Sequence, residues 1–129
     1  MMVAGGDFIT SEVLEYLNSF GKEVQAVFGN MDEPLLKETL PETLELKIEG
    51  LNIGIYHGNG PPQGIEERVK AKFKDIMDAY IFGHTHYPIN EVIEHSLYFN
   101  PGTVTGYKAS LGFLYIEFKK IYGEIIYLN

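Results

Sequence analysis

The sequence predicts an α/β fold, and three observations lead to this prediction. Short apolar segments of strand length outnumber the segments with helical periodicity. The helical segments alternate with strands in the first part of the chain, which is typical of α/β domains. The chain has 129 residues and is 45% hydrophobic and 13% aromatic, so residues 1–129 can form a single domain with a core of its own.

The first elements are a strand, a helix and a second strand. Val3 and Ala4 resemble the end of a strand that runs into Gly5-Gly6-Asp7. A helix is expected over 11–20, with Thr10 as its N-cap and Gly21 as its stop. A short apolar strand over 24–28 follows it and ends at Gly29-Asn30.

The middle of the chain predicts a helical turn, a hairpin and a helix. Pro34 begins a helical turn that extends to Leu40. Residues 43–48 and 51–56 alternate between apolar and polar and form the hairpin, whose second strand leads to His57. The helix that follows has its apolar residues on one face, and these are Ile65, Val69, Phe73 and Ile76.

The remaining elements are strands. The apolar segment 79–82 predicts a buried strand that ends at Gly83. Residues 90–93 and 97–99 form a hairpin, followed by a turn over 100–103. Residues 112–118 and 124–128 form a closing hairpin.

Composition excludes several classes of protein. The formal net charge is −8 and there is no Lys/Arg stripe, so sequence-independent nucleic-acid binding is not expected. No apolar segment approaches the roughly 20 residues that a membrane helix needs. The first residues lack a basic region typical of a signal peptide, so we expect a cytoplasmic protein. Because cysteine is absent, a metal could be held only by imidazole, carboxylate or amide ligands.

Four strands end in the same way, with glycine and a side chain that can bind a metal. These side chains are Asp7, Asn30, His57, His84 and His86. The carboxyl ends of strands in a predominantly parallel sheet lie side by side, so these groups are expected to converge. One carboxylate, one amide and three imidazoles suit manganese, iron, nickel or zinc better than calcium or magnesium. The alternatives are turn residues for Asp7 and Asn30, and a loop histidine for His57.

The order of these motifs resembles that of the calcineurin-like metallophosphoesterases. Members of that family carry motifs similar to Gly6-Asp7, Gly29-Asn30-Met31-Asp32, His57-Gly58 and Gly83-His84-Thr85-His86. Asn100-Pro101-Gly102-Thr103 resembles the Asn-Pro-Gly-Ser of the YfcE-like phosphodiesterase subgroup. The resemblance implies a β-sandwich flanked by helices, two divalent metals at the strand ends, and hydrolysis of a phosphodiester by metal-bound hydroxide.

The resemblance also implies a role for each of the five residues. Asp7 would bridge the two metals. Asn30, His57 and His84 would complete one site, and Asn30 would also reach the phosphate. His86 would belong to the second site. No residue is assigned as the catalytic proton donor, because Met31 stands where many relatives have a histidine.

The chain departs from the family at its start. The family begins with a strand that ends in Asp-x-His, and that strand is missing before Val3, so the fold is expected to be N-terminally truncated. The second metal site, with Asp7 and His86 alone, would be weak, and one metal is possible in place of two. The lost strand would expose unpaired backbone, which predicts a homodimer. The alternatives are a non-catalytic scaffold of the same fold, as in a retromer subunit, or an inactive fragment of an enzyme.

Overall fold

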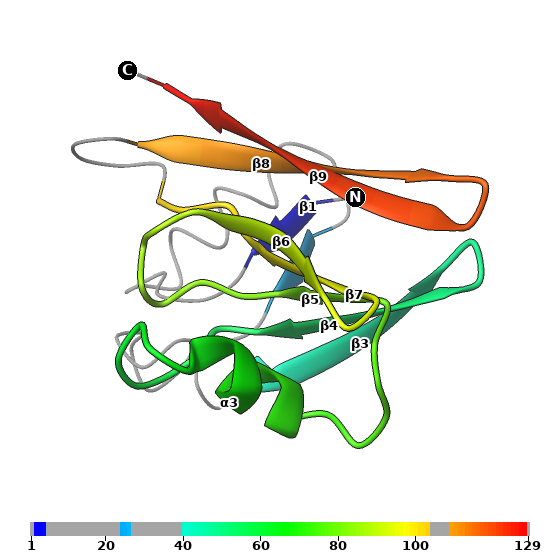
Figure 1. The fold of residues 1–129 in the computed structure, drawn as a ribbon, viewed down its shortest axis with the longest axis horizontal. Helices are drawn as coiled ribbons and strands as arrows, with labels where there is room; N and C mark the ends of the chain where they lie inside the picture. Colours follow the sequence, from blue (N-terminus) through cyan, green and yellow to red (C-terminus); the bar gives the residue numbers. More distant parts are fainter. Residues whose placement is uncertain (1, 5–23, 27–39, 104–108, 129) are drawn as a thin grey trace.

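The computed structural model describes residues 2–4, 24–26, 40–103 and 109–128 (Figure 1). The first two described segments are the short strands β1 (Met2–Ala4) and β2 (Val24–Ala26), which pair in parallel. Both lie within the strands expected at these positions. The predicted helix over 11–20 lies outside the described residues, as does all but the last residue of the predicted turn over 34–40.

The centre of the fold is a sheet of five strands in the order β3-β4-β5-β7-β6. Its strands are β3 (Thr43–Ile48), β4 (Leu51–Tyr56), β5 (Ala79–Ile81), β6 (Ile89–Ile93) and β7 (Ser96–Asn100). β4, β5 and β7 pair in parallel, and β3 and β6 pair antiparallel at the two edges. The three central strands are parallel, as expected, and the antiparallel edges are the two hairpins predicted from residues 43–48 and 51–56 and from residues 90–93 and 97–99.

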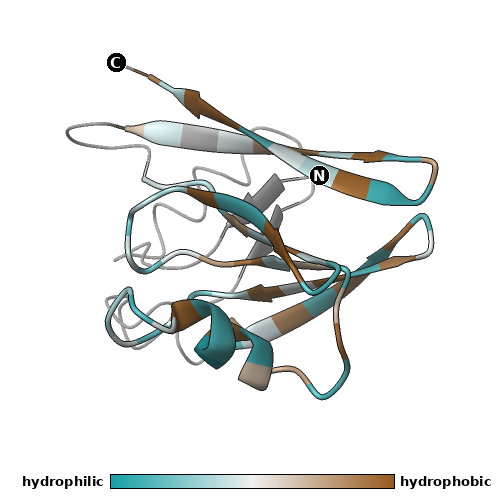
Figure 2. Cartoon of the chain, in the orientation of Figure 1, coloured by the Kyte–Doolittle hydropathy of each residue, from teal (hydrophilic) through white to brown (hydrophobic). Residues whose placement is uncertain are grey.

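One face of this sheet packs against the helix α3 (Ile65–Ala71). Ile65 and Val69 are buried against the sheet, and Figure 2 shows hydrophilic residues over much of the rest of the helix. The prediction was wrong for Ile76, which is 71% exposed. The helix ends at Ala71, so the helical periodicity no longer places Ile76 on the buried face.

The other face of the sheet packs against a hairpin of β8 (Ser110–Glu117) and β9 (Lys120–Tyr127). The predicted start of β8 lies two residues after the observed one, and the predicted start of β9 lies four residues after the observed one. Both strands are longer because the turn is only Phe118-Lys119, and both residues have the positive φ that a tight two-residue hairpin turn requires. Apolar side chains from alternate positions of the hairpin face the sheet, so the two sheets form a sandwich.

Phe99 occupies the centre of this sandwich and is 2% exposed. The hairpin approaches it most closely at Gly112 and Gly123. A Cβ atom on Gly123 would lie 2.4 Å from Phe99 Cε1, and one on Gly112 would lie 2.5 Å from Phe99 Cζ. These distances are well inside van der Waals contact, so the packing of the hairpin on the sheet requires glycine at both positions.

Tyr98 is expected to make the free energy of unfolding fall at alkaline pH. Burial, the neighbouring Tyr80 and the carboxylates of Glu94 and Glu66 raise the pKa of Tyr98 to about 12. The neutral phenol is therefore favoured in the folded state, and this contribution to stability is complete below about pH 10 and lost as the pH rises through about 12. We expect the free energy of unfolding of Tyr98→Phe to fall less than that of the wild type between about pH 10 and 12.

Urea unfolding at a series of pH values measures this difference. Tyr87→Phe is the matched control, because Tyr87 is exposed on the surface. Parallel pH profiles for the wild type and Tyr98→Phe would contradict the prediction.

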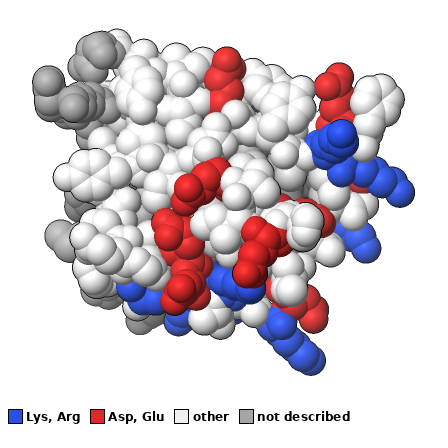
Figure 3. All heavy atoms as spheres, viewed as in Figure 1, with Lys and Arg blue, Asp and Glu red and all other residues white. Residues whose placement is uncertain are grey.

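Acidic side chains gather over α3 and the β6–β7 hairpin on the face seen in Figure 3. This agrees with the net charge of −8 and does not provide the basic surface that a nucleic-acid backbone would need. Within the described part of the chain, no helix has the length and apolar character to cross a membrane.

Candidate metal centre

The candidate site lies at the carboxyl ends of three neighbouring parallel strands. β5 pairs with β4 on one side and with β7 on the other, so the residues that follow these strands meet at one edge of the sheet. Those residues are His57 after β4, Gly83-His84 after β5, and Asn100 at the end of β7. The amide of Gly83 donates to the His57 carbonyl over 2.8 Å and joins the first two strand ends.

The imidazoles of His57 and His84 lie edge to face, with ring centroids 5.3 Å apart and an interplanar angle of 81°. His57 is 4% exposed, and His84 is half-buried. Gly58, between β4 and the following loop, has φ +105°, and a Cβ there would lie 3.3 Å from His84 Cβ. The predicted convergence of the histidines after β4 and β5 is thus what the structure shows.

His84 and His86 both adopt the left-handed backbone region, with φ of 68° and 65°. For residues other than glycine this conformation costs about 1–2 kcal/mol each, so neighbouring contacts must stabilise it. Thr85 lies between them, and its amide donates to the Gly83 carbonyl over 2.8 Å. The segment from Gly83 to His86 is therefore a compact and strained turn at the edge of the sheet, as is common at functional sites.

Asn100 holds this turn in place. It is fully buried, and its amide nitrogen donates to the Gly83 carbonyl and to Thr85 Oγ1, each over 3.2 Å. Its side-chain oxygen accepts a 2.9 Å hydrogen bond from the amide of Gly102. From the sequence, Asn100 is placed in a turn and in the motif that resembles Asn-Pro-Gly-Ser, with no role in the site. Its position at the end of a strand beside the histidine motif was the available signal for a site role.

Replacing Asn100 by leucine is expected to lower the free energy of unfolding by about 1–2 kcal/mol, because buried polar groups lose their partners. Leucine has a similar size and leaves little cavity. Urea unfolding measures the change, with Asn52→Leu as the control, since Asn52 is an exposed asparagine on β4 of the same sheet. Equal losses in the two variants would show that Asn100 contributes no more than a surface residue.

The five predicted ligands are not all placed by the structure. His57 and His84 are brought together, whereas His86 is exposed. Asp7 and Asn30 lie outside the described residues. Within the described ranges alone, no group of three or more His, Asp or Glu side chains is arranged to hold a metal ion. Metal binding by these five residues therefore stays a prediction.

The donors that are present nevertheless fit a divalent transition metal. Two neutral imidazoles at one strand edge suit zinc, nickel, iron or manganese. His84 Nε2 lies 3.0 Å from the carbonyl oxygen of Gly60. Metal-binding histidines usually donate their second ring N–H to such an oxygen, which fixes the orientation of the ring. His84 thus has the outer contact that a metal ligand typically has.

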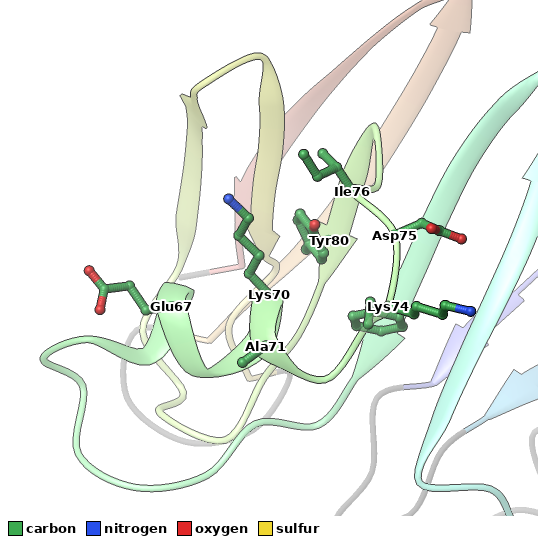
Figure 4. Close-up of a pocket in the computed structure, with 8 residues that line it drawn as sticks. Glu67, Lys70, Ala71, Lys74, Asp75, Ile76 and Tyr80 are labelled. Carbon is green, nitrogen blue, oxygen red and sulfur yellow. The ribbon is translucent and has the colours of Figure 1, made fainter.

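An open hollow of about 320 Å³ lies elsewhere, beside α3 and Tyr80 (Figure 4). Lys70, Lys74 and the exposed Ile76 border it. None of the predicted metal ligands lines this hollow, so it does not belong to the candidate metal centre.

Comparison with known sequences identifies the family. The model of the calcineurin-like phosphoesterase superfamily domain matches residues 1–120. A probable metallophosphoesterase of Methanothermobacter thermautotrophicus is 30% identical over 130 residues, which cover 98% of this chain and 74% of the relative. A phosphodiesterase of Methanocaldococcus jannaschii is 30% identical over 135 residues, which cover 94% of this chain and 78% of the relative. The chain belongs to the calcineurin-like phosphoesterase superfamily.

Solved structures share the fold. A Thermotoga maritima protein matches with a TM-score of 0.77 and 32% identity, over 98% of this chain and 79% of that one. The phosphoesterase YfcE of E. coli matches with a TM-score of 0.62 and 26% identity, over 85% of this chain and 70% of that one. Vps29 of Entamoeba histolytica in complex with Zn²⁺ matches with a TM-score of 0.72 and 23% identity, over 98% of this chain and 81% of that one. At this identity the match supports the fold alone. The predicted metallophosphoesterase fold is confirmed, while the finer subgroup and the N-terminal truncation stay predictions.

Proposed function

We propose that this chain is a metal-dependent phosphodiesterase. The observation that carries the proposal is the contact between the His57 and His84 rings at the ends of adjacent parallel strands, in a chain of this superfamily. The sequence relatives named as a metallophosphoesterase and a phosphodiesterase support the same reaction class. The proposal goes beyond this reaction class in two points: the substrate is a phosphodiester, and it is hydrolysed at this edge of the sheet.

In this proposal His57, His84, Asp7 and Asn30 hold one divalent cation, and Asp7 and His86 hold a second one more weakly. A bound divalent cation supplies Lewis-acid chemistry, since it neutralises phosphoryl charge and makes water more acidic. Neutral imidazoles leave most of the cation's charge uncancelled, so the site would attract a phosphodiester anion in spite of the net charge of −8. Asn30 would orient the phosphate.

The described residues contribute position and orientation. Asn100 holds the turn that carries His84 and His86, and the Gly60 carbonyl orients the His84 ring. Fixing ligands before the cation arrives lowers the ordering cost of binding. His57 is 4% exposed, so little of this residue is open to water.

Metal removal tests the proposal. We expect hydrolysis of bis(p-nitrophenyl) phosphate to be lost after dialysis against a chelator and restored by Mn²⁺, because the reaction depends on the cation. Hydrolysis of p-nitrophenyl phosphate under the same conditions is the comparison, and we expect the diester to be the better substrate. Zn²⁺, Ni²⁺ and Fe²⁺ are tested in parallel. Absence of metal-dependent hydrolysis with all four metals would contradict the proposal.

The alternative is a non-catalytic scaffold of the same fold. One observation favours it: the outward face of the β8–β9 hairpin exposes Phe113, Tyr115 and Tyr122. Metal analysis of the purified protein separates the two, because the alternative expects no bound metal. The homodimer and the cytoplasmic location stay predictions, and light scattering tests the first of these.

A further inference from the structure

Arg68 of α3 binds the loop that follows His57. Its Nε donates to the Asn59 carbonyl over 2.8 Å, and its Nη1 donates to the Gln63 carbonyl over 3.0 Å. Its Nη2 donates to the carbonyl of Pro61. All three acceptors are backbone carbonyls of one loop, so the planar guanidinium fixes the path of the loop from Asn59 to Gln63.

Gly60 lies against the guanidinium. A Cβ on Gly60 would be 3.0 Å from Arg68 Cζ and Nε, so the guanidinium packs directly on this residue, whose φ is +77°. The carbonyls on either side of it, those of Asn59 and Pro61, bind Arg68. The carbonyl of Gly60 itself lies 3.0 Å from His84 Nε2. The position of this oxygen therefore follows from the contacts of Arg68.

This contact has a chemical consequence for His84. A carbonyl oxygen accepts hydrogen bonds and cannot donate them, so the neutral ring must carry its proton on Nε2. Nδ1 then holds the lone pair that can bind a cation. The opposite tautomer would place two acceptors 3.0 Å apart. The loop thus determines which of the two ring nitrogens of His84 can bind a cation.

We infer that Arg68 is a positioning residue of the metal centre, which holds the Gly60 carbonyl against His84 Nε2 and so presents Nδ1 to the cation. The part that concerns metal affinity rests on the proposed function. The part that concerns the tautomer applies to the metal-free protein. A residue that served only to stabilise α3 would leave the tautomer of His84 unchanged.

The test is the tautomer of His84 in the metal-free protein, read by long-range ¹H–¹⁵N NMR at about pH 8.5, where histidine side chains are mostly neutral. We expect the wild type to carry the proton on Nε2. Arg68→Lys keeps the charge and loses the fork of donors, and we expect it to give a mixture of tautomers. Lys70→Met is the matched control, because Lys70 is on the same helix and pairs with Glu94 instead.

Gly60→Ala is a second variant that keeps Arg68 in place. The added Cβ would push against the guanidinium and displace the Gly60 carbonyl, so we expect the same mixture of tautomers. Urea unfolding shows which variants are folded, and the inference is judged on the folded ones. A pure Nε2–H tautomer in folded Arg68→Lys or folded Gly60→Ala would overturn it.

Calorimetric titration with Mn²⁺ is the second measurement. We expect Arg68→Lys to weaken binding by roughly 10–100-fold, the usual effect of losing a partner that orients a ligand, and Lys70→Met to leave it unchanged. If the wild type binds no metal, the proposed function fails, and the tautomer measurement still decides the role of Arg68. Wild-type affinity in a variant that has lost the Nε2–H tautomer would overturn the link to metal binding.

Discussion

His84→Ala is expected to lower the metal-dependent hydrolysis of bis(p-nitrophenyl) phosphate by more than about 100-fold. Loss of a partner that only orients a metal ligand typically costs 10–100-fold, and loss of the ligand itself should cost more. His84 is the residue with the strongest geometric support, because its ring contacts His57 and its Nε2 lies on the Gly60 carbonyl. Alanine removes both contacts and the proposed donor.

His95→Ala is the matched control for this experiment. His95 is exposed in the β6–β7 turn, and its φ of 72° is close to the 68° of His84. The backbone cost of placing alanine in the left-handed region is therefore similar in the two variants. We expect His95→Ala to keep wild-type activity. Equal rates in His84→Ala and the wild type would rule out catalysis at this strand edge.

The histidine pair shows how much of the site could be predicted from the sequence. Two apolar strands that each lead to a glycine and a histidine, in a sheet with parallel neighbours, place both rings at one edge. The alternation of residues 43–48 and 51–56 likewise predicted β3 and β4 with the correct bounds. Both predictions depend on local patterns, namely side-chain alternation and the glycine that ends a strand.

The contacts that hold the histidines could not be predicted in this way. Asn100 reaches Gly83 across 17 residues of sequence, and His84 reaches Gly60 across 24. No periodicity records such pairs, and asparagine after a strand is favoured by ordinary turns as well. Arg68 is not among the apolar residues that define the buried face of its predicted helix, so the helical pattern indicated no role for it. Its role depends on a loop whose path is set by the fold as a whole.

The two glycines that face Phe99 are another feature that local sequence patterns could not predict. Gly123 lies just before the strand predicted over 124–128 and Gly112 at the start of the one predicted over 112–118, where a glycine is ordinary, so neither indicated a packing role. In the structure, Gly112 and Gly123 approach Phe99 from the two strands of the hairpin. The ring is buried and confined by both, so it has little space into which it could move.

Gly123→Ala is accordingly expected to lower the free energy of unfolding by about 2–3 kcal/mol. The new Cβ would lie 2.4 Å from Phe99 Cε1 and 3.0 Å from Asn90 Oδ1. Overpacking of a core by one methyl group typically costs 1–3 kcal/mol, and here the ring cannot turn away. Lys120→Ala on the same strand is the control, because Lys120 is exposed at the start of β9. Urea unfolding measures both changes.

A second substitution separates this clash from a general loss of strand stability. Phe99→Leu removes the ring atoms that the new Cβ would meet, although it leaves a partly empty space and is itself destabilising. If the clash is the cause, Phe99→Leu with Gly123→Ala should be more stable than the sum of the single changes predicts, by about 1–2 kcal/mol. Strictly additive losses would mean that alanine acts through the backbone of β9. The close contact of the hairpin with Phe99 would then not be what requires glycine at this position.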